Sequence, residues 1–400
     1  MRFQKVLVTA FRYFPDDPSG SSRLAYEEAL YLRDLGHEVW IVAPDLTEGK
    51  PEHCVESGLH VLRYSAPRYA AFDPRRLRAH QKMTGALLAR HVGAGVDLVI
   101  GHSLFQYDEA LARYGDRARS RFSVHSPIRL EMLAASRGAS VVKRLHHLVS
   151  SRLTERVEHR CLQRSDCITS DSEFTRLALG RIHGKEISKR VQVIPGWVDL
   201  ARFRIVADRE RLKIALGWPS NVPVFFCLRR LVPRMGLDRL LYAAREVKSV
   251  GLHFRLVIGG GGPLRRQLER LASELDLSRE VRFVGFVPES DLPKMYAAAD
   301  AFVLPTADLE CFGLIALEAL ACGRPVLATP VAAIPEIIRQ IEPRWLATDE
   351  LARSIAELLV GYLKGELPSH SPESLRQFVS QRYAKERVLE ELAVASGVVE

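Results

Sequence analysis

The sequence predicts an α/β protein with two Rossmann-like, doubly wound domains. Its 400 residues exceed the usual size of a single hydrophobic core, which favours two domains. Short apolar runs alternate with helix-forming stretches, as expected for parallel sheets that are covered by helices on both faces. The alternation occurs as two series, one ending near Pro195–Gly196 and the next beginning near residue 222. We therefore expect one domain over residues 1–195, a second over 196–374, and a hinge at Pro195–Gly196.

The first series predicts the strands and helices of the N-terminal domain. Residues 6–11, VLVTAF, form a short apolar run that is typical of a buried first strand. A polar loop follows, and we expect a helix from about Ser22 to Leu35 because Gly36 ends the helical pattern. Later strands are expected within HEVWIVAP, VDLVIGHS, RFSVHSP, DCITS and VQVIP, with a helix around 149–164.

The second series predicts another parallel sheet. Its strands are expected within VPVFFCL, LHFRLVIG, VRFVGFV, DAFVLPT and RPVLATP, and its helices near 238–250, 263–275, 289–298 and 314–321. Residues 365–374 interrupt the pattern with prolines and small polar residues, and a final helix is expected from about Pro372 to Ala395.

Charge and cysteine content limit the functional classes. Residues 1–195 carry 30 Lys and Arg against 22 Asp and Glu, whereas residues 196–400 carry 27 against 26. The six cysteines form no C-x-x-C pair and no zinc-like spacing, so we expect reduced thiols and no structural metal. No apolar stretch approaches the length of a membrane span, and the N-terminus does not resemble a signal sequence. We therefore expect a cytoplasmic protein.

The region from Arg113 to Arg160 contains the densest group of basic residues. A helical apolar stripe beside them could contact anionic lipid. Its members would be Val141, Leu145, Leu148, Val149 and Leu153. A solvated basic face on an ordinary surface helix is the alternative. Nucleic acid is not an expected partner, because no recognition module accompanies the arginines.

Two glutamates eight positions apart carry the strongest functional signal. Glu318 lies in the otherwise apolar run LIALEALAC, where an unpaired carboxylate would cost several kcal/mol of desolvation. Sugar or ribose hydroxyls could meet it, and Glu310 in the preceding loop could bind a second set. The helix start at Phe312, Gly313 and Leu314 offers backbone N–H groups to an anion. A ligand that offers both hydroxyls and an anion is a nucleotide sugar. The alternative is that Glu318 forms a buried ion pair with an arginine.

The E-x7-E spacing, the Phe-Gly after the first glutamate and the following ALACGRPV resemble the donor site of retaining glycosyltransferases of family four. The resemblance covers roughly residues 5–395. It implies the GT-B fold of the group 1 glycosyl transferases, in which two Rossmann-like domains face each other across a cleft and a C-terminal helix, about 375–400, returns to the N-terminal domain. It also implies sugar transfer from a nucleoside diphosphate with retention and without metal or cofactor. Glu310 would hold sugar hydroxyls and Glu318 the ribose.

The segment RRLVPRMG resembles the family's Arg-Leu-Val-Pro-x-Lys-Gly, whose Arg and Lys neutralise the donor diphosphate. Arg230 matches the arginine and is therefore a catalytic and donor-binding candidate. Met235 stands at the lysine position and removes a charged hydrogen bond, typically worth roughly 1.5–3 kcal/mol. Arg234 could replace that lysine, since a guanidinium also binds phosphate well. Weakened or lost transfer is the alternative.

Two glycine-containing turns complete the donor side of the resemblance. The run GGGGP, with Gly261 inside it, is similar to the family's Gly-x-Gly-Pro turn beside the nucleotide. No G-K-[ST] follows it, which argues against a phosphate loop. In VRFVGFVP, the backbone near Phe286 and Val287 matches the stretch that meets the base. Plain strand-to-loop transitions would also explain both turns.

The N-terminal domain carries the remaining candidates. His125, at the end of RFSVHSP, matches the histidine that points at the donor sugar in the resembled family, so we expect a catalytic role. Gly20 matches the second glycine of the family's Gly-Gly loop, with Ser19 in place of the first, and that loop faces donor phosphate or acceptor. His102 and Ser172 are acceptor-side candidates. A structural histidine is the alternative for His125, and a helix N-cap is the alternative for Ser172.

Together these patterns predict a metal-independent, retaining hexosyltransferase that takes part in polysaccharide, glycolipid or other glycoconjugate biosynthesis. UDP is slightly favoured over GDP in the donor. The sequence does not identify the acceptor, although the basic N-terminal domain favours a lipid-linked or membrane-surface acceptor and peripheral contact with anionic membrane. A nucleotide-sugar-binding or membrane-scaffold protein without transfer activity and a nucleotide-sugar epimerase stay open as alternatives. A phosphorylase is disfavoured because no lysine motif suits a pyridoxal cofactor.

Overall fold

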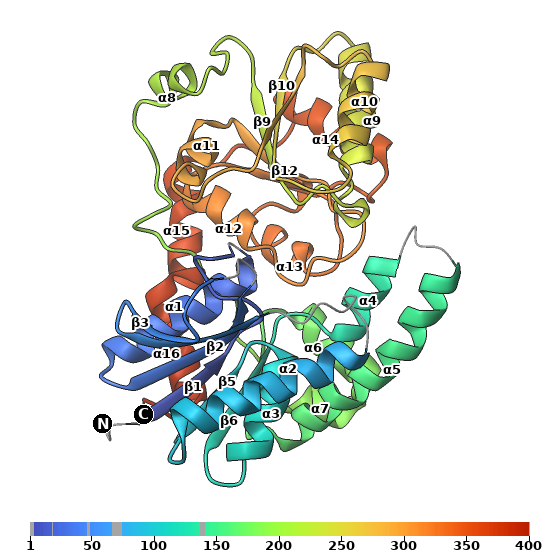
Figure 1. Ribbon diagram of the computed structural model, residues 1–400. Coiled ribbons are helices and arrows are strands. Elements are labelled where there is room, and N and C mark those ends of the chain that lie inside the picture. Colours follow the sequence, from blue (N-terminus) through green and yellow to red (C-terminus); the bar gives the residue numbers. More distant parts are fainter. Residues whose placement is uncertain (1–3, 18, 46–48, 66–73, 137–140, 400) are drawn as a thin grey trace. The chain divides into compact units, whose positions relative to one another are not determined.

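The computed structural model describes residues 4–17, 19–45, 49–65, 74–136 and 141–399, without the side chains of residues 74, 136 and 141–149. The chain divides into two compact units. Unit 1 consists of Met1–Gly196 together with Glu386–Glu400, and unit 2 is Trp197–Lys385. The C-terminal segment of unit 1 thus begins at Glu386, whereas the resemblance placed it near residue 375. Figure 1 shows the chain leaving unit 1 in green, forming unit 2 and returning to unit 1 in red.

Unit 1 contains an eight-stranded sheet with the order β3-β4-β2-β1-β5-β6-β7-β8. Its pairs are parallel except for the antiparallel hairpin of β3 and β4. The strands are β1 (Lys5–Thr9), β2 (Glu38–Asp45), β3 (His53–Glu56), β4 (Leu59–Ser65), β5 (Leu98–Gly101), β6 (Arg119–Val124), β7 (Cys167–Ser170) and β8 (Val191–Val193). The helices are α1 (Gly20–Asp34), α2 (Pro74–Leu87) with a π-helical turn at Leu88–Val92, α3 (Leu104–Tyr114), α4 (Ile128–Ser136), α5 (Val141–Arg164), α6 (Glu173–His183), α7 (Lys185–Arg190) and α16 (Lys385–Ala395).

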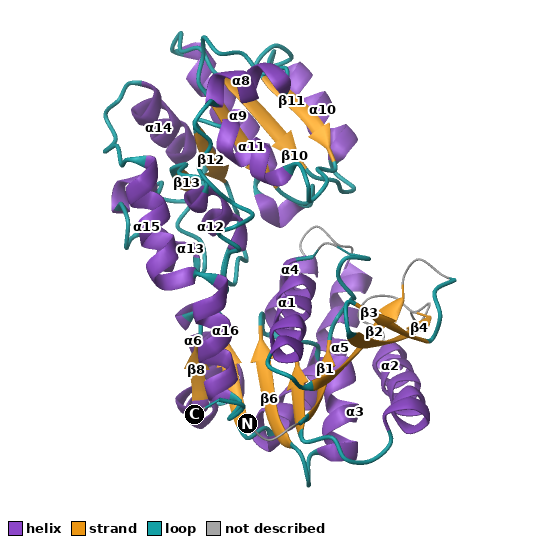
Figure 2. Cartoon of the chain, turned by 90° about the vertical axis from the view of Figure 1, so that its left-hand side faces the viewer, coloured by secondary structure: helices purple, strands orange, loops and turns teal. Residues whose placement is uncertain are grey.

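Unit 2 contains a five-stranded parallel sheet with the order β11-β10-β9-β12-β13. Its strands are β9 (Val224–Leu228), β10 (Arg255–Gly259), β11 (Val281–Gly285), β12 (Ala301–Leu304) and β13 (Val326–Ala328). Its helices are α8 (Arg209–Ala215), α9 (Leu237–Ser249), α10 (Arg265–Glu274), α11 (Leu292–Ala298), α12 (Leu314–Ala321), α13 (Ile334–Ile338), α14 (Ala352–Leu363) and α15 (Pro372–Tyr383), with 3-10 turns at Pro233–Met235 and Pro343–Trp345. Figure 2 shows strands and helices interleaved in each unit, and the predicted α/β fold with two Rossmann-like domains is confirmed.

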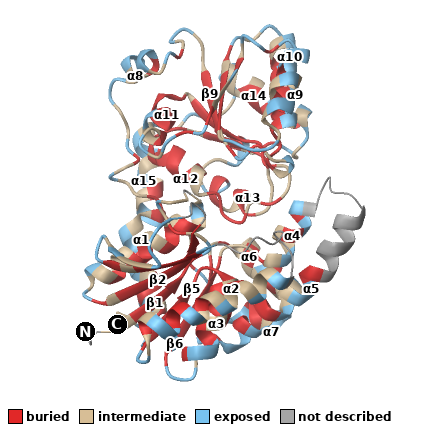
Figure 3. Cartoon of the chain, in the orientation of Figure 1, coloured by how far each residue is buried: buried red, intermediate tan, exposed pale blue. Residues whose placement is uncertain are grey.

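The sheet of unit 1 is buried on both faces. Leu7 packs into one hydrophobic cluster, whereas its neighbours Val6 and Val8 pack into another. Alternate residues of a strand point to opposite faces, so both faces of β1 are covered. Figure 3 shows the same pattern as continuous red strands between helices that are red on only one side. This double burial explains why the strands are uninterrupted apolar runs.

The long C-terminal helix expected from the sequence is two helices. Ala384, which separates α15 from α16, has extended backbone angles of φ −63° and ψ 134°. Val198 forms hydrogen bonds with the backbone on either side of this break. Its N–H donates to the carbonyl of Tyr383 over 2.9 Å, and its carbonyl accepts from the N–H of Lys385 over 3.2 Å. The helix therefore breaks because a neighbouring segment supplies these hydrogen bonds instead.

Helix α5 begins at Val141, eight residues before the expected start. Four members of the proposed apolar stripe, at positions 141, 145, 148 and 149, have side chains outside the described residues. The fifth, Leu153, is exposed. The hairpin of β3 and β4 was not predicted.

A close backbone approach at Gly260 gives a stability prediction. Gly260 has φ +114°, and a Cβ atom there would lie 2.0 Å from the carbonyl oxygen of Arg229. We expect Gly260→Ala to lower the free energy of unfolding of unit 2 by about 1–3 kcal/mol through overpacking. Gly261→Ala is the matched control, because a Cβ at Gly261 meets no atom within 4 Å. Chemical unfolding followed by tryptophan fluorescence measures both, and equal effects would contradict the close approach.

Candidate functional site

The strand order of unit 2 reverses between β9 and β12, since β10 and β11 lie on one side of β9 and β12 and β13 on the other. Open parallel sheets bind ligands at the carboxyl ends of their strands beside such a switch point. Residues 229–236 follow β9, and residues 305–313 follow β12. The RRLVPRMG segment and the start of the E-x7-E motif therefore meet at the edge where a ligand is expected.

An ion pair connects these two segments. Arg229 Nη2 donates to Glu310 Oε2 over 2.6 Å and to Thr306 Oγ1 over 2.6 Å. The Arg229 side chain is 6% exposed and that of Glu310 is 19% exposed. Arg229 Nε, also buried, has no hydrogen-bond partner within the part of the chain that the structure describes. The pair thus fixes one carboxylate oxygen of Glu310.

Helix α12 follows Glu310 and carries Glu318, the second glutamate of the motif. Gly313, its N-cap, has φ +97° and ψ 54°, a left-handed conformation that favours glycine. Leu314 starts the helix and Phe312 is buried before it, in edge-to-face contact with Tyr383 at 6.1 Å. Glu318 is 2% exposed, as its apolar surroundings predicted. The helix N-terminus thus lies between the two glutamates of the motif and can interact with an anion.

The other donor-side candidates follow strands of the same sheet at their carboxyl ends. A Cβ atom at Gly236, which follows Met235, would lie 1.9 Å from the carbonyl oxygen of Pro305, so the two loops are in close contact. Gly261 faces open space, and Phe286 follows β11 with a side chain that is 68% exposed. Val287 is buried.

The predicted phosphate-binding cations have different environments. The side chain of Arg230 is exposed, whereas that of Arg234 is half-buried and its carbonyl accepts from the N–H of Ala307 over 2.9 Å. Met235, at the position where the resembled family has a lysine, is buried. The guanidinium that contacts Glu310 belongs to Arg229, one residue before the arginine that the motif indicated.

Four side chains of unit 1 form a hydrogen-bonded chain that we call the histidine relay: Glu28, His102, His125 and Asp171. Glu28 Oε2 lies 2.9 Å from His102 Nε2, and His102 Nδ1 lies 2.8 Å from His125 Nε2. His125 Nδ1 lies 2.8 Å from Asp171 Oδ2. The relay begins in α1 and continues along residues that follow the adjacent strands β5, β6 and β7. His125 and His102, both predicted as site residues, are therefore in direct contact.

Charges around the relay set its protonation. Burial opposes ionisation of Glu28, but Arg121 and His102 lower the pKa of Glu28 to about 2. Burial lowers the pKa of His102. For His125 burial acts in the same direction, but the neighbouring carboxylate of Asp171 outweighs it and raises the pKa. Arg121 itself is held by the carbonyl of Leu392 over 2.9 Å and by Ser396 Oγ over 2.7 Å, both at the C-terminal end of unit 1.

The remaining unit 1 candidates lie at helix N-termini. Ser19 is the N-cap residue of α1 and Gly20 is its first residue, two positions before the expected start. Ser172 is buried and accepts from the N–H of Thr175 over 3.1 Å as the N-cap of α6. The N-cap alternative for Ser172 is thus present in the structure.

Several residues of these arrangements were not selected from the sequence. Arg229, Thr306, Glu28, Asp171 and Arg121 belong to this group. A signal existed for Arg121, which begins the predicted strand RFSVHSP, because a charged residue in a sheet covered on both faces requires a buried partner. Consecutive arginines at a strand end point to opposite sides, so spacing alone does not tell which one reaches Glu310.

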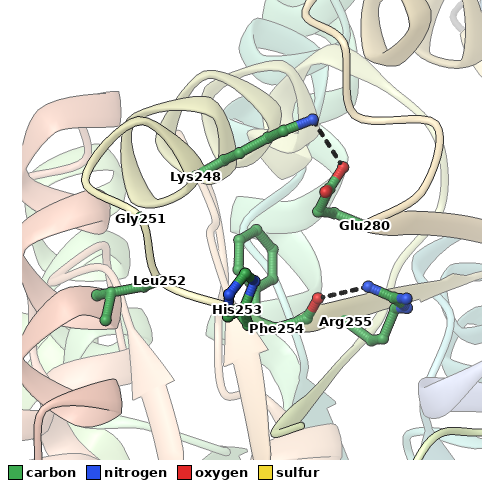
Figure 4. A pocket seen from close by; sticks show the side chains of 7 residues that line it. All are labelled: Lys248, Gly251, Leu252, His253, Phe254, Arg255 and Glu280. Carbon is green, nitrogen blue, oxygen red and sulfur yellow. Dashed lines mark hydrogen bonds and ion pairs between the residues drawn. The ribbon is translucent and has the colours of Figure 1, made fainter.

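A cavity of about 210 Å³ lies elsewhere in unit 2, between the end of α9 and the start of β10. Figure 4 shows Lys248 pointing towards Glu280 across it, and their Nζ and Oε2 atoms are 3.2 Å apart. None of the predicted donor residues lines this cavity. No group of three or more potential metal ligands occurs among the residues that the structure describes.

Comparison with solved structures defines the class of the fold. Sucrose-phosphate synthase from Thermosynechococcus elongatus superposes with a TM-score of 0.80 over 98% of both chains, at 21% identity. The fold is thus that of the two-domain GT-B glycosyltransferases. Two family models match the sequence: Glycosyltransferase Family 4 over residues 18–202 and Glycosyl transferases group 1 over residues 208–383.

Curated relatives are similar over part of the chain. A D-inositol 3-phosphate glycosyltransferase of Corynebacterium jeikeium is 30% identical over 296 residues, which are 70% of this chain and 68% of the relative. A GDP-mannose-dependent alpha-(1-6)-phosphatidylinositol monomannoside mannosyltransferase of Mycolicibacterium smegmatis is 36% identical over 181 residues, or 44% of this chain. The match spans about half, 47%, of that relative's length. The chain belongs to the group 1 glycosyltransferases.

The ion pair of Arg229 and Glu310 gives a second stability prediction. We expect Arg229→Met to destabilise unit 2 by about 2 kcal/mol or more, because it leaves a largely buried carboxylate without its cation. Arg353→Met removes an exposed partner of Glu357 in α14 and should cost less than about 0.5 kcal/mol. Urea unfolding compares the variants. Equal losses in the free energy of unfolding would show that the buried pair stabilises the protein no more than the exposed pair does.

Proposed function

We propose that this protein is a retaining, metal-independent glycosyltransferase that uses a nucleoside diphosphate sugar. In the reaction, the bond between the anomeric carbon and the diphosphate oxygen breaks, and a bond forms between that carbon and an acceptor oxygen. The acceptor hydroxyl loses its proton, and the diphosphate leaves as an anion. Retention at the anomeric carbon is an expectation from the family resemblance.

One observation carries this proposal: a buried ion pair and a buried glutamate lie on either side of a helix N-terminus at the switch point of unit 2. Because Arg229 contacts Glu310 Oε2, the other oxygen is outside the ion pair and can accept sugar hydroxyls. Glu318 supplies a second carboxylate for ribose hydroxyls. The start of α12 lies between them in the sequence, and we propose that the diphosphate binds there. The three groups match the parts of a nucleotide sugar: the carboxylate of Glu310 accepts hydrogen bonds from the sugar, the start of α12 binds the diphosphate, and the carboxylate of Glu318 accepts hydrogen bonds from the ribose.

Charge on the leaving diphosphate requires cations. Arg229 Nε is a buried donor, and Arg230 and Arg234 follow it in the same loop. We propose that these arginines and the N-terminus of α12 stabilise the departing diphosphate electrostatically, so that no metal is needed. Arg229 then compensates for the missing lysine at Met235.

For the donor we propose GDP-mannose as the first candidate. The sequence alone slightly favoured UDP. The Mycolicibacterium relative is named as GDP-mannose-dependent, and it is more similar to this chain than the UDP-complexed structure from Anabaena, which is 16% identical and supports only the fold. UDP-glucose and UDP-N-acetylglucosamine are the donors to compare.

A calorimetric titration without metal tests the donor site. We expect micromolar binding of one nucleotide sugar by the wild type and at least about tenfold weaker binding by Glu318→Gln, because a hydrogen bond to a charged group is worth roughly 1.5–3 kcal/mol. Glu357→Gln, at an exposed position in α14, is the control and should bind like the wild type. Equal affinities of all three proteins would contradict the role of Glu318, and absence of binding would contradict the donor class.

The acceptor we propose is lipid-linked or carries an inositol phosphate. The names of the relatives contain phosphatidylinositol monomannoside and D-inositol 3-phosphate. Residues 1–195 carry 30 basic against 22 acidic side chains, which favours an anionic surface. We propose that this charge supports peripheral contact with anionic lipid. No helix among the described residues is long and apolar enough to cross a membrane.

Liposome sedimentation tests this contact. We expect more of the protein to sediment with vesicles that contain anionic lipid than with neutral vesicles at low salt, and the difference to disappear at high salt because of screening. Equal binding to both kinds of vesicle at low salt would contradict an electrostatic contact.

A binding protein without transfer activity is the second candidate, and the uncharged Met235 is the observation that favours it. Donor binding without release of the nucleoside diphosphate, across inositol phosphate, lipid and water as acceptors, would support this candidate. Release of the diphosphate with formation of a glycoside would exclude it.

A further inference from the structure

The histidine relay contains more contacts than two neutral histidines have protons. Each of its three nitrogen contacts is 2.8–2.9 Å long and requires one N–H proton. With both carboxylates ionised, the protons must all reside on His102 and His125. Two neutral imidazoles carry only two N–H protons, whereas the contacts require three. One of the rings is therefore an imidazolium when the relay is intact.

The contact between the two rings supports this count. The ring centroids are 5.1 Å apart, the ring planes differ by 18°, and the facing nitrogens are 2.8 Å apart, so the rings meet edge to edge nearly in one plane. In such an arrangement the nitrogen of one ring points directly at the nitrogen of the other. Without a shared proton, two lone pairs would face each other over 2.8 Å. A pair of merely packed histidines does not require this geometry.

The surrounding charges place the surplus proton on His125. Arg121 Nη2 donates to Glu28 Oε1, so the carboxylate beside His102 is already neutralised by a cation. His102 and Glu28 are each 2% exposed, whereas His125 and Asp171 are each 15% exposed. A second cation on His102 would lie close to Arg121 in the buried end, but on His125 it is paired with Asp171. His102 then donates through Nε2 to Glu28 and accepts through Nδ1 from His125.

We propose that the histidine relay holds His125 as an imidazolium with both N–H groups occupied, so that His125 serves sugar transfer as a fixed cation and not as a general base. Glu28, His102, Asp171 and Arg121 are the positioning residues of this arrangement. The proposal deepens the proposed function and rests on it only for the effect on the donor. The titratable and charged groups that contribute to the pKa values of the two rings are these same residues and the partner ring, from α1, β6 and the segments after β5, β6 and β7.

The protonation state can be measured on the full-length free protein. Side-chain 15N NMR of histidine-labelled protein distinguishes protonated from bare ring nitrogens, and the spectra of His125→Gln and His102→Gln assign the two rings. We expect both nitrogens of His125 to be protonated above pH 6.5, where a free imidazole loses its second proton. His102 should show a protonated Nε2 and a bare Nδ1. A bare nitrogen on His125 at neutral pH would overturn the proposal.

Two uncharged isosteres provide the matched comparison. Asp171→Asn removes the carboxylate that favours the imidazolium, so His125 should lose its second proton at a lower pH than in the wild type. Glu158→Gln removes the carboxylate of a different buried pair, with His183 at 2.8 Å, and should leave the titration of His125 unchanged. An unchanged titration in Asp171→Asn would also overturn the proposal.

A donor titration separates this proposal from the proposed function. We expect the wild type to bind GDP-mannose or UDP-glucose several-fold more weakly once the pH exceeds the pKa of His125, and Asp171→Asn to show that loss at a lower pH. Donor binding with no dependence on the protonation of His125 would overturn its role as a fixed cation. An imidazolium in a protein that binds no donor would contradict the proposed function but leave the protonation state established.

Discussion

The ion pair between Arg229 and Glu310 is the interaction on which the proposed donor site depends. It joins the segments after β9 and β12, the two strands between which the order of the unit 2 sheet reverses. Close backbone approaches join the neighbouring loops: Gly236 lies against the carbonyl of Pro305, and Gly260 lies against the carbonyl of Arg229. With one carboxylate oxygen held by Arg229, the orientation of Glu310 is set before any ligand binds. Preorganisation of this kind reduces the entropic cost of holding a sugar in one position.

Unit 1 also holds polar side chains together at the carboxyl ends of its strands. Because its strands are parallel, the residues that follow β5, β6 and β7 lie at one edge of the sheet, which brings His102, His125 and Asp171 into line. The buried end of this line depends on Arg121, which is hydrogen-bonded to the C-terminal segment at Leu392 and Ser396. The return of the chain to unit 1 therefore supports the charge balance of the histidine relay as well as the hydrophobic core.

Much of this organisation could be predicted from the sequence. Apolar runs located the parallel strands, and the motif E-x7-E placed Glu318 in a buried helix. Other features follow from contacts between distant segments, which periodicity does not contain. The choice between Arg229 and Arg230 depends on which side of the strand end faces Glu310, and the break at Ala384 depends on hydrogen bonds from Val198. The antiparallel hairpin of β3 and β4 was missed because β3 has only four residues, of which His53, Cys54 and Glu56 give a weak apolar signal.

The most direct test of the central claim is to locate donor binding by hydrogen exchange. The full-length protein would be compared with and without GDP-mannose, and with UDP-glucose, by mass spectrometry of its peptides. If the switch point of unit 2 is the donor site, peptides that cover residues 229–236, 259–263 and 305–322 gain protection, and the peptide lining the cavity of Figure 4, residues 248–255, does not. Protection at that cavity without protection of residues 305–322 would contradict the assignment of the donor site.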